Sequence, residues 1–305
     1  MCASVAHCTP ITSEPSLVVC LTSRVVTRRL AVLCARVGLA VTVLAGSTLI
    51  PLATAQAQRT LTVIATDSAL QTPPSVPAGI TTLRLQLAGK TRRDLTLHRV
   101  PAGTPPETVA RGAAGRPERW FEQASFGGPA VPRDSAPDAN ATVDLRPGRY
   151  VLVSYEVDSA GRPRADRYIW RDVTIIAGSV LIPARFAVPD AMIKLKDARI
   201  DVTGVLKTGQ RTLQFDNVGA RPHDAVIGRL KPGKTVADVA RWDRDRNDEA
   251  PFVYVGGLTP MSAFVTAQTR LTLQSGMHVV FCTTKHTGER ERDYKRGVLA
   301  SFKVN

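Results

Sequence analysis

The chain repeats itself at an offset of 130 residues, and this repeat constrains the fold more than any other feature. Segment 218–242 has the pattern of a strand, a loop, a second strand, a Pro-Gly turn and a short helix, and segment 88–110 has the same order. The matching pairs are Gly79 with Gly209, Leu83 with Leu213, Gly89 with Gly219, and Gly103 with Gly233. Further along, Leu145, Gly148 and Val151 match Leu273, Gly276 and Val279 at an offset of 128. A small change in loop length between tandem copies would produce this drift, so the sequence predicts two similar domains.

Each copy is built from short segments in which polar and apolar residues alternate, as in 60–66, 80–87 and 210–216. This alternation predicts strands with one buried face. The order Thr104-Pro-Pro-Glu107 predicts the start of a short helix, and Thr235 followed by Asp238 predicts a second one at the equivalent place. Repeats of this size that consist mainly of short strands predict two β-sandwiches in tandem.

The first 57 residues differ from the rest of the chain. Four arginines precede an apolar run at 37–52, and small residues end the segment at Ala57. This pattern predicts a secretory signal cleaved after Ala57. An uncleaved N-terminal anchor is the alternative, and both interpretations place the body of the protein outside the cytoplasm. The predicted organisation is a signal at 1–57, a first domain at 58–176, a linker at 177–189 and a second domain at 190–305.

Cysteine usage agrees with a single thiol in the exported chain. Cys2, Cys8, Cys20 and Cys34 all lie in the predicted signal, which leaves Cys282 alone. The mature chain therefore has no intramolecular disulfide.

The net charge of the chain and its lack of catalytic motifs limit the classes of function that the sequence predicts. The net charge is +14, which favours acidic proteins or anionic lipid surfaces as partners. Aromatic residues are only 5% of the chain and the basic residues are interspersed with acids, which argues against nucleic acid. The G-x-S-x-G, H-E-x-x-H, Walker and C-x-x-C-H patterns do not occur. The sequence therefore predicts a protein that is not an enzyme.

Two features resemble a known family. A histidine, His223, follows the first hairpin of the second repeat, and Gly276-Met-His-Val-Val-Phe-Cys282 has the form G-x-[Y/H]-x-x-x-C. This arrangement resembles the cupredoxins, in particular exported bacterial proteins with tandem cupredoxin-like domains. The resemblance implies an all-β fold of two tandem Greek-key β-sandwiches, each with a short helix. It also implies one copper site in a metal-binding domain, made of two histidines, a cysteine and often a methionine.

The expected copper ligands are only partly present. His223 and Cys282 match the first histidine and the cysteine, but Asp293 and Val298 stand where the second histidine and the methionine are expected. In the first domain the same positions hold Arg93, Ser154, Arg164 and Ile169. The resemblance therefore implies a first domain without metal and a second domain with a degenerate site.

Two interpretations of the second domain stay open. In the favoured one no cofactor is bound, Cys282 is a small buried core residue, and His223 is a polar loop residue that bonds the backbone. In the alternative, His286 joins His223 and Cys282 in a trigonal site for one copper ion.

The predicted function follows from the loss of ligands in a retained fold. We expect an exported, non-enzymatic binding or scaffold protein that docks on an acidic protein or a membrane-associated complex through basic loops. A mononuclear copper electron carrier that uses only the second domain is the alternative. A merely solvated surface is the other interpretation of the basic residues. The candidate docking residues are Arg93, Arg164, Arg167, Arg171, Arg290, Arg292, Lys295 and Arg296.

Overall fold

The computed structural model describes residues 59–115, 124–131, 138–158, 163–178, 185–244, 246 and 248–305. The predicted signal at 1–57 lies outside these residues. Thr54–Asn305 forms one compact unit. Within the described residues, every helix is too short or too polar to cross a membrane.

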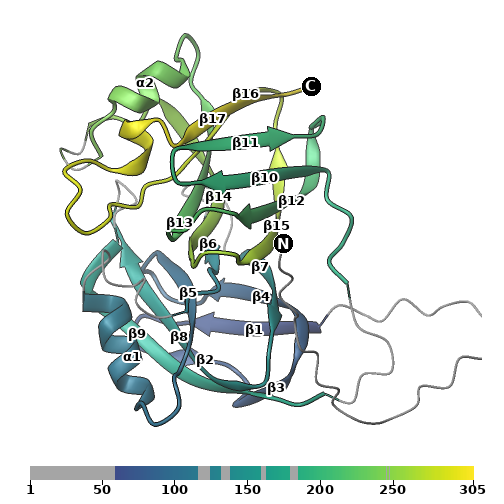
Figure 1. The fold of residues 1–305 in the computed structure, drawn as a ribbon, viewed down its shortest axis with the longest axis vertical. Helices are drawn as coiled ribbons and strands as arrows, with labels where there is room; N and C mark the ends of the chain where they lie inside the picture. The colour runs from purple at the N-terminus through teal and green to yellow at the C-terminus, as the bar shows by residue number, and fades with distance from the viewer. Residues whose placement is uncertain are drawn as a thin grey trace, which may run out of the picture. The chain divides into compact units, whose positions relative to one another are not determined.

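The first repeat folds into two facing sheets (Figure 1). Alternation of buried and exposed residues along β1 and β4 shows why these segments form strands with one face in the core. Its elements are β1 (Arg59–Ala65), β2 (Leu70–Gln71), β3 (Ser75–Pro77), β4 (Gly79–Leu87), β5 (Arg93–Arg99), α1 (Pro106–Gly115), β6 (Pro129–Ala130), β7 (Asp138–Leu145), β8 (Gly148–Val157) and β9 (Pro163–Ile176).

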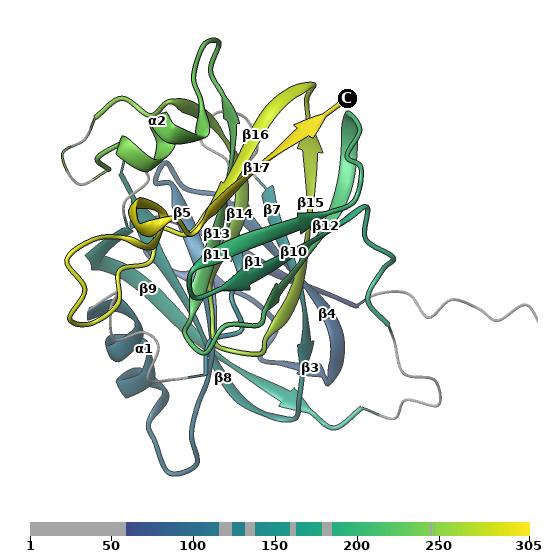
Figure 2. The same ribbon diagram turned by 45° about the horizontal axis from the view of Figure 1, so that its top comes forward.

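The second repeat has the same plan, seen best in Figure 2. The predicted helix start is confirmed, because Asp238 accepts hydrogen bonds from the backbone N–H and the hydroxyl of Thr235. Its elements are β10 (Ala191–Lys196), β11 (Arg199–Thr203), β12 (Gly209–Asn217), β13 (His223–Leu230), α2 (Val236–Arg241), β14 (Phe252–Met261), β15 (Thr266–Leu273), β16 (Gly276–Phe281), the 3₁₀ helix η2 (Asp293–Arg296) and β17 (Leu299–Val304).

Equivalent strands make equivalent pairings, which confirms the repeat. β1 runs parallel to β4 with Leu61 opposite Leu83, and β10 runs parallel to β12 with Ala191 opposite Leu213. The chain crosses between facing sheets after β12, β14 and β15, so each repeat is a Greek-key sandwich. The prediction of an all-β fold with two tandem sandwiches, each with a short helix, is confirmed.

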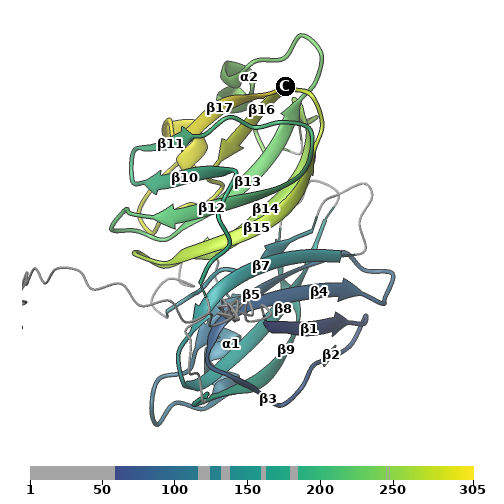
Figure 3. The same cartoon turned by 90° about the vertical axis from the view of Figure 1, so that its right-hand side faces the viewer.

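The two sandwiches share their sheets. Within the described residues, one eight-stranded sheet has the order β11-β10-β12-β15-β7-β4-β1-β2, which can be followed in Figure 3. β7 and β15 are the equivalent strands of the two repeats and pair antiparallel, with Val143 opposite Ala267. The order of strands is therefore symmetric about this pair. Short β6 also joins β14 of the other sandwich, where Ala130 lies opposite Gly257.

Two glycines make the close approach of strands possible at this junction. A Cβ atom on Gly128 would stand 2.1 Å from the carbonyl oxygen of Leu95, and one on Gly257 would stand 1.9 Å from that of Ala225. Gly128 directly precedes β6, and Gly257 lies in β14, the strand with which β6 pairs. Thr259 completes the junction by donating its hydroxyl to the Leu95 carbonyl at 3.0 Å.

Gly128→Ala tests whether the two sandwiches unfold together. The added methyl group has no space in a buried strand, so we expect a loss of about 1–3 kcal/mol in the free energy of unfolding. Because β6 pairs with β14, the thermal transition of the whole chain should shift as one in calorimetry.

Gly103→Ala is the matched control, since nothing lies within 4 Å of its Cβ position and φ is +77°. It should cost only the left-handed backbone penalty, about 1 kcal/mol. Two separate transitions, of which only one shifts with Gly128→Ala, would contradict the shared sheet.

Candidate metal centre

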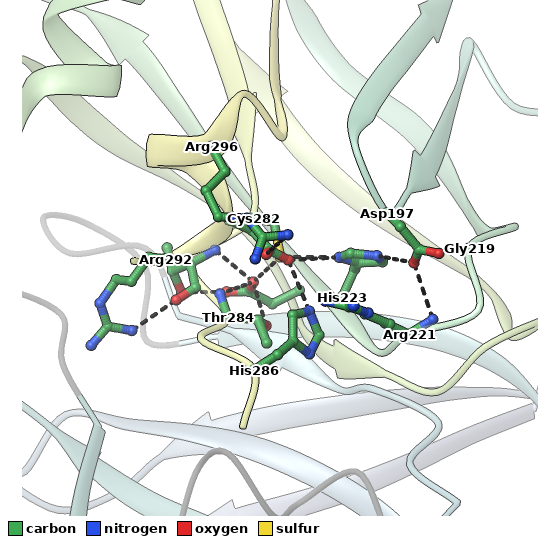
Figure 4. A network of polar contacts seen from close by, with 12 residues as sticks. Asp197, Gly219, Arg221, His223, Cys282, Thr284, His286, Arg292 and Arg296 are labelled. Atoms are coloured by element: carbon green, nitrogen blue, oxygen red, sulfur yellow. Dashed lines mark hydrogen bonds and ion pairs between the residues drawn. The ribbon is translucent and has the colours of Figure 1, made fainter. Parts of the chain in front are cut away.

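The candidate site lies at one end of the second sandwich, where three segments meet (Figure 4). The turn between β10 and β11 supplies Asp197, and the start of β13 supplies His223 and Asp224. The segment after β16 supplies Cys282, His286 and Asp293. The sandwich fold therefore brings together residues that are almost 100 positions apart in the sequence.

His223 is buried and held between two carboxylates. Its exposed fraction is 0%, its Nε2 lies 3.1 Å from Asp197 Oδ1, and its Nδ1 lies 3.1 Å from Asp293 Oδ2. Burial lowers the pKa of His223, but the hydrogen bonds to Asp293 and Asp197 outweigh it and leave this pKa above its usual value. The expectation of a polar loop residue bonded to the backbone is wrong, because His223 begins a core strand and its bonds go to side chains.

Asp197 fixes the loop that carries His223. Its carboxylate accepts the backbone N–H groups of Ala220 and Arg221 at 3.1 Å each. Gly219 is required beside it, since a Cβ atom there would stand 2.5 Å from Asp197 Oδ1. The same device occurs in the first sandwich, where Asp67 accepts the N–H groups of two residues after Gly89.

Cys282 is fully buried and its sulfur faces the other polar groups. Sγ lies 2.9 Å from Asp224 Oδ1, 3.4 Å from Asp293 Oδ2 and 3.4 Å from His223 Nδ1. Burial, together with the two carboxylates, raises the pKa of the Cys282 thiol well above its usual value. The thiol is therefore protonated at neutral pH and donates to Asp224.

Asp224 is held by the chain that follows Cys282. It accepts the backbone N–H and the hydroxyl group of both Thr283 and Thr284. Five donors, counting the thiol of Cys282, thus converge on one buried carboxylate. These hydrogen bonds stabilise the buried carboxylate.

One carboxylate oxygen of Asp293 lies at the centre of the cluster. Its Oδ2 lies 3.1 Å from His223 Nδ1, 3.1 Å from His286 Nε2 and 3.4 Å from Cys282 Sγ. Burial raises the pKa of Asp293, but hydrogen bonds to the two imidazoles outweigh it and hold this pKa far below its usual range. The second carboxylate oxygen, Oδ1, is buried without a hydrogen-bond partner among the described residues, with Arg296 Nη2 at 3.8 Å.

These residues fit a metal ion by the chemistry of their donor atoms. Among the described residues, His223, His286 and Asp293 have ligand atoms mutually within 4.8 Å, and Cys282 adjoins two of them. Two imidazoles, a carboxylate and a thiol suit a four-coordinate transition metal. The orphaned Oδ1 of Asp293 is a further acceptor that an ion would satisfy.

Sequence reasoning identified His223, Cys282 and His286 but treated Asp293 only as a lost histidine. The structure brings all four together. Aspartate is itself a metal ligand, so the presence of Asp293 where the family's second histidine is expected was the available signal. Val298, in the methionine column, is buried in the apolar core.

The equivalent region of the first sandwich holds different groups. Arg93 takes the place of His223 and donates from Nη2 to the backbone carbonyl of Asp67 at 3.0 Å. It is only 5% exposed, so its assignment to a docking surface is wrong: the guanidinium replaces a core imidazole rather than facing solvent. Ser154, in the place of Cys282, is fully buried, and Ile169 packs partly buried against the apolar core. A first domain without metal stays a prediction.

The other basic candidates divide into two groups. Near the second site, Lys295 pairs with Asp243 at 3.1 Å, Arg296 pairs with Glu289, and Arg292 donates to the Thr283 carbonyl at 2.7 Å. These contacts hold the segment after Cys282 in place, and Arg290 stays exposed. On β9 of the first sandwich, Arg164, Arg167 and Arg171 are all exposed.

Comparisons with known proteins match this chain to solved structures alone. A scan against protein-family models and a search of curated proteins give no match. Among solved structures, reduced auracyanin from Roseiflexus castenholzii matches 37% of this chain and 94% of its own, at 19% identity and a TM-score of 0.28. Auracyanin A from Chloroflexus aurantiacus, described as a blue copper protein, matches 37% and 98%, at 15% identity and a TM-score of 0.26.

The copper-containing nitrite reductase from Thermus scotoductus spans both repeats, covering 81% of this chain and 61% of its own at 9% identity and a TM-score of 0.24. Identities and TM-scores at this level carry over neither ligands nor activity to this chain.

The buried ion pairs predict how the stability of the metal-free protein depends on pH. Asp293 has a lowered pKa, so its stabilisation is present above the ordinary carboxyl pKa of about 4 and fades as pH falls below it. His223 has a raised pKa, so its stabilisation is present below the ordinary histidine pKa of about 6.5 and fades as pH rises above it. Chemical unfolding should show maximal stability near pH 5.

Asp293→Asn should lower the free energy of unfolding near pH 5 by about 3 kcal/mol, because it leaves buried imidazoles without their anion. The pH dependence of the variant should flatten on both sides. Asp67→Asn removes a carboxylate of the first sandwich whose pKa is also lowered, by hydrogen bonds from Thr91, so it should change only the acid side and leave the fall in stability above about pH 6.5 unchanged. An unchanged profile for Asp293→Asn would contradict this description of the network.

Proposed function

We propose that this chain is an exported protein whose second sandwich holds a single transition metal ion, with copper as the first candidate. His223, Cys282, His286 and Asp293 are the proposed ligands. The convergence of three donor atoms on Asp293 Oδ2, at 3.1–3.4 Å, carries the proposal. The first sandwich serves as a structural partner.

The contact made by the second ring nitrogen of His223 supports a role for this residue as a metal ligand. A ligand histidine usually donates its other ring N–H to a carboxylate or carbonyl, which fixes the ring and directs the free nitrogen at the metal. Asp197 lies 3.1 Å from Nε2 and leaves Nδ1 directed toward Cys282 and Asp293. The loop carboxylate would thus orient the imidazole.

Burial of the ligands supports holding an ion rather than converting a substrate. His223, Cys282 and Asp293 are each 0% exposed and His286 is 9% exposed. The imidazole of His286 is therefore the proposed ligand nearest to solvent. A copper ion bound by these residues would supply one-electron chemistry and a thiolate-to-copper absorption band.

Metal titration of the chelator-treated protein tests the proposal. One equivalent of Cu(II) should bind, and Cys282→Ser should lose the charge-transfer band because the thiolate is its source. His223→Gln should weaken binding severely, because it removes a nitrogen donor. Elemental analysis that finds no bound metal, together with a titration without saturation, would rule the proposal out.

Variants at equivalent positions of the two sandwiches separate an effect on metal binding from an effect on folding. Asp197→Asn should weaken metal affinity by about 10–100-fold, as loss of an outer carboxylate partner typically does. Asp67→Asn and Ser154→Ala change the equivalent positions of the first sandwich and should leave the affinity unchanged. Equal losses in both sandwiches would indicate a general effect on folding.

A second candidate function, docking on an acidic partner, is favoured by the surface of β9. Arg164 and Arg167 both contact the one carboxylate of Glu156, at 3.8 and 3.6 Å, which leaves an excess of positive charge. Arg171 is also exposed, whereas the side chain of Trp170, the preceding residue, points to the opposite face of the sheet. Exposed arginines that exceed the carboxylates they contact suit an acidic protein surface.

Binding to an immobilised acidic protein at rising salt tests this second function. Replacing Arg164, Arg167 and Arg171 together by Gln should abolish salt-sensitive retention. The matched control replaces Arg84, Arg111 and Arg146, each paired with its own carboxylate. Equal retention of both variants would contradict docking through β9.

A further inference from the structure

Asp293 is the one proposed ligand that donates through oxygen, whereas the other three donate through nitrogen or sulfur. It lies within 3.1 Å of both imidazole nitrogens, and Cys282 adjoins it at 3.4 Å. The carboxylate brings a fixed negative charge into a site where every proposed ligand is at most 9% exposed. The charge of the bound ion must therefore balance the charge of the ligands, because a net charge in such a site is costly.

We infer that Asp293 makes the site selective for a divalent ion over Cu(I), so that the protein holds a divalent ion rather than cycling copper between oxidation states. This inference rests on the proposed function. Binding converts the Cys282 thiol to a thiolate and releases its proton. The thiolate and the Asp293 carboxylate then carry two negative charges, which a divalent ion neutralises. Cu(I) would leave one negative charge uncompensated.

Asp224 increases the cost of that uncompensated charge. Its Oδ1 lies 2.9 Å from Cys282 Sγ, and it is itself only 6% exposed. The four donors from Thr283 and Thr284 are all directed at Asp224, where they stabilise its charge without neutralising it, and none is left for a second anion. An excess negative charge on the thiolate side would therefore face another buried carboxylate.

The backbone keeps Asp293 inside the site. Its N–H donates to the Thr284 carbonyl at 2.9 Å, and its carbonyl accepts from Val298 at 3.0 Å. The next residue, Tyr294, is fully buried, and its hydroxyl donates to the Trp242 carbonyl at 3.0 Å. Asp293 thus begins a 3₁₀ helix that is anchored on both sides, and its side chain is buried in the site.

The donor type acts in the same direction as the charge. Thioether and thiolate groups favour Cu(I), whereas carboxylates suit harder ions. Val298 provides no sulfur in the methionine column. The buried methionine opposite His223 on β14, Met261, packs its side chain against Gly127 of the first sandwich. The oxygen of Asp293 is therefore the fourth donor that the chain presents.

Competition titrations with Zn(II), Cu(II) and Cu(I) test the inference on the full mature chain. Each ion is titrated against a colorimetric chelator, with Cu(I) kept reduced under nitrogen. The wild-type protein should bind both divalent ions more tightly than Cu(I). Asp293→Asn, which keeps the shape and removes the charge, should lose at least tenfold in affinity for the divalent ions and less for Cu(I), reducing the preference.

Asp293→Glu and Asp293→Met separate charge from donor type. Glu keeps the charge, so the divalent preference should persist even where affinity falls; Met supplies a thioether, so Cu(I) should become the preferred ion. Circular dichroism confirms that each variant is folded. Tighter binding of Cu(I) by the wild type, or equal losses for all three ions in Asp293→Asn, would overturn the inference while leaving the metal site standing. Absence of binding by all three ions would overturn both the proposed function and the inference.

Discussion

The pairing of β7 with β15 is the contact on which the rest of the molecule depends. Each strand is the last of its own four-strand sheet, and an unpaired edge strand exposes a row of donors and acceptors to other chains. Pairing equivalent strands covers both edges at once. Asn140 strengthens the seam, because its side chain exchanges two hydrogen bonds with the backbone of Arg270. The first sandwich thus has a structural role of its own, because it covers the edge of the second sandwich's sheet.

One framework carries two different chemistries in the two repeats. Asp67 and Asp197 have the same role toward the backbone: each accepts two N–H groups of a loop that crosses between sheets, from β4 to β5 and from β12 to β13. Only Asp197 also meets an imidazole, because Arg93 stands where the second sandwich has His223. The carboxylate at this position therefore serves the fold in both repeats. Its contact with an imidazole in the second repeat requires only one further difference, His223 in place of Arg93.

The sequence was sufficient for most of the strands, the repeat and three of the proposed ligands, because these depend on local patterns. It failed for β14, where Gly256 and Gly257 have φ of +142° and +149° and interrupt the alternation that marks a strand. It failed for Arg93 because a charged side chain is normally exposed, and only the structure shows the backbone carbonyls that receive its guanidinium. Asp293 was missed as a ligand because its value depends on His223 and His286, which only the folded chain brings to it.

In the metal-free cluster, protons take the place of the positive charge that a metal ion would supply. Asp293 pairs with His223, whose raised pKa favours the imidazolium, and the thiol of Cys282 keeps its proton because burial and two facing carboxylates raise its pKa. A metal ion would displace protons from both residues, since only neutral imidazole and thiolate are ligands. The same residues can therefore form a stable core without a metal and a closed site with one. The affinity for an ion must rise with pH, because each released proton opposes binding in acid.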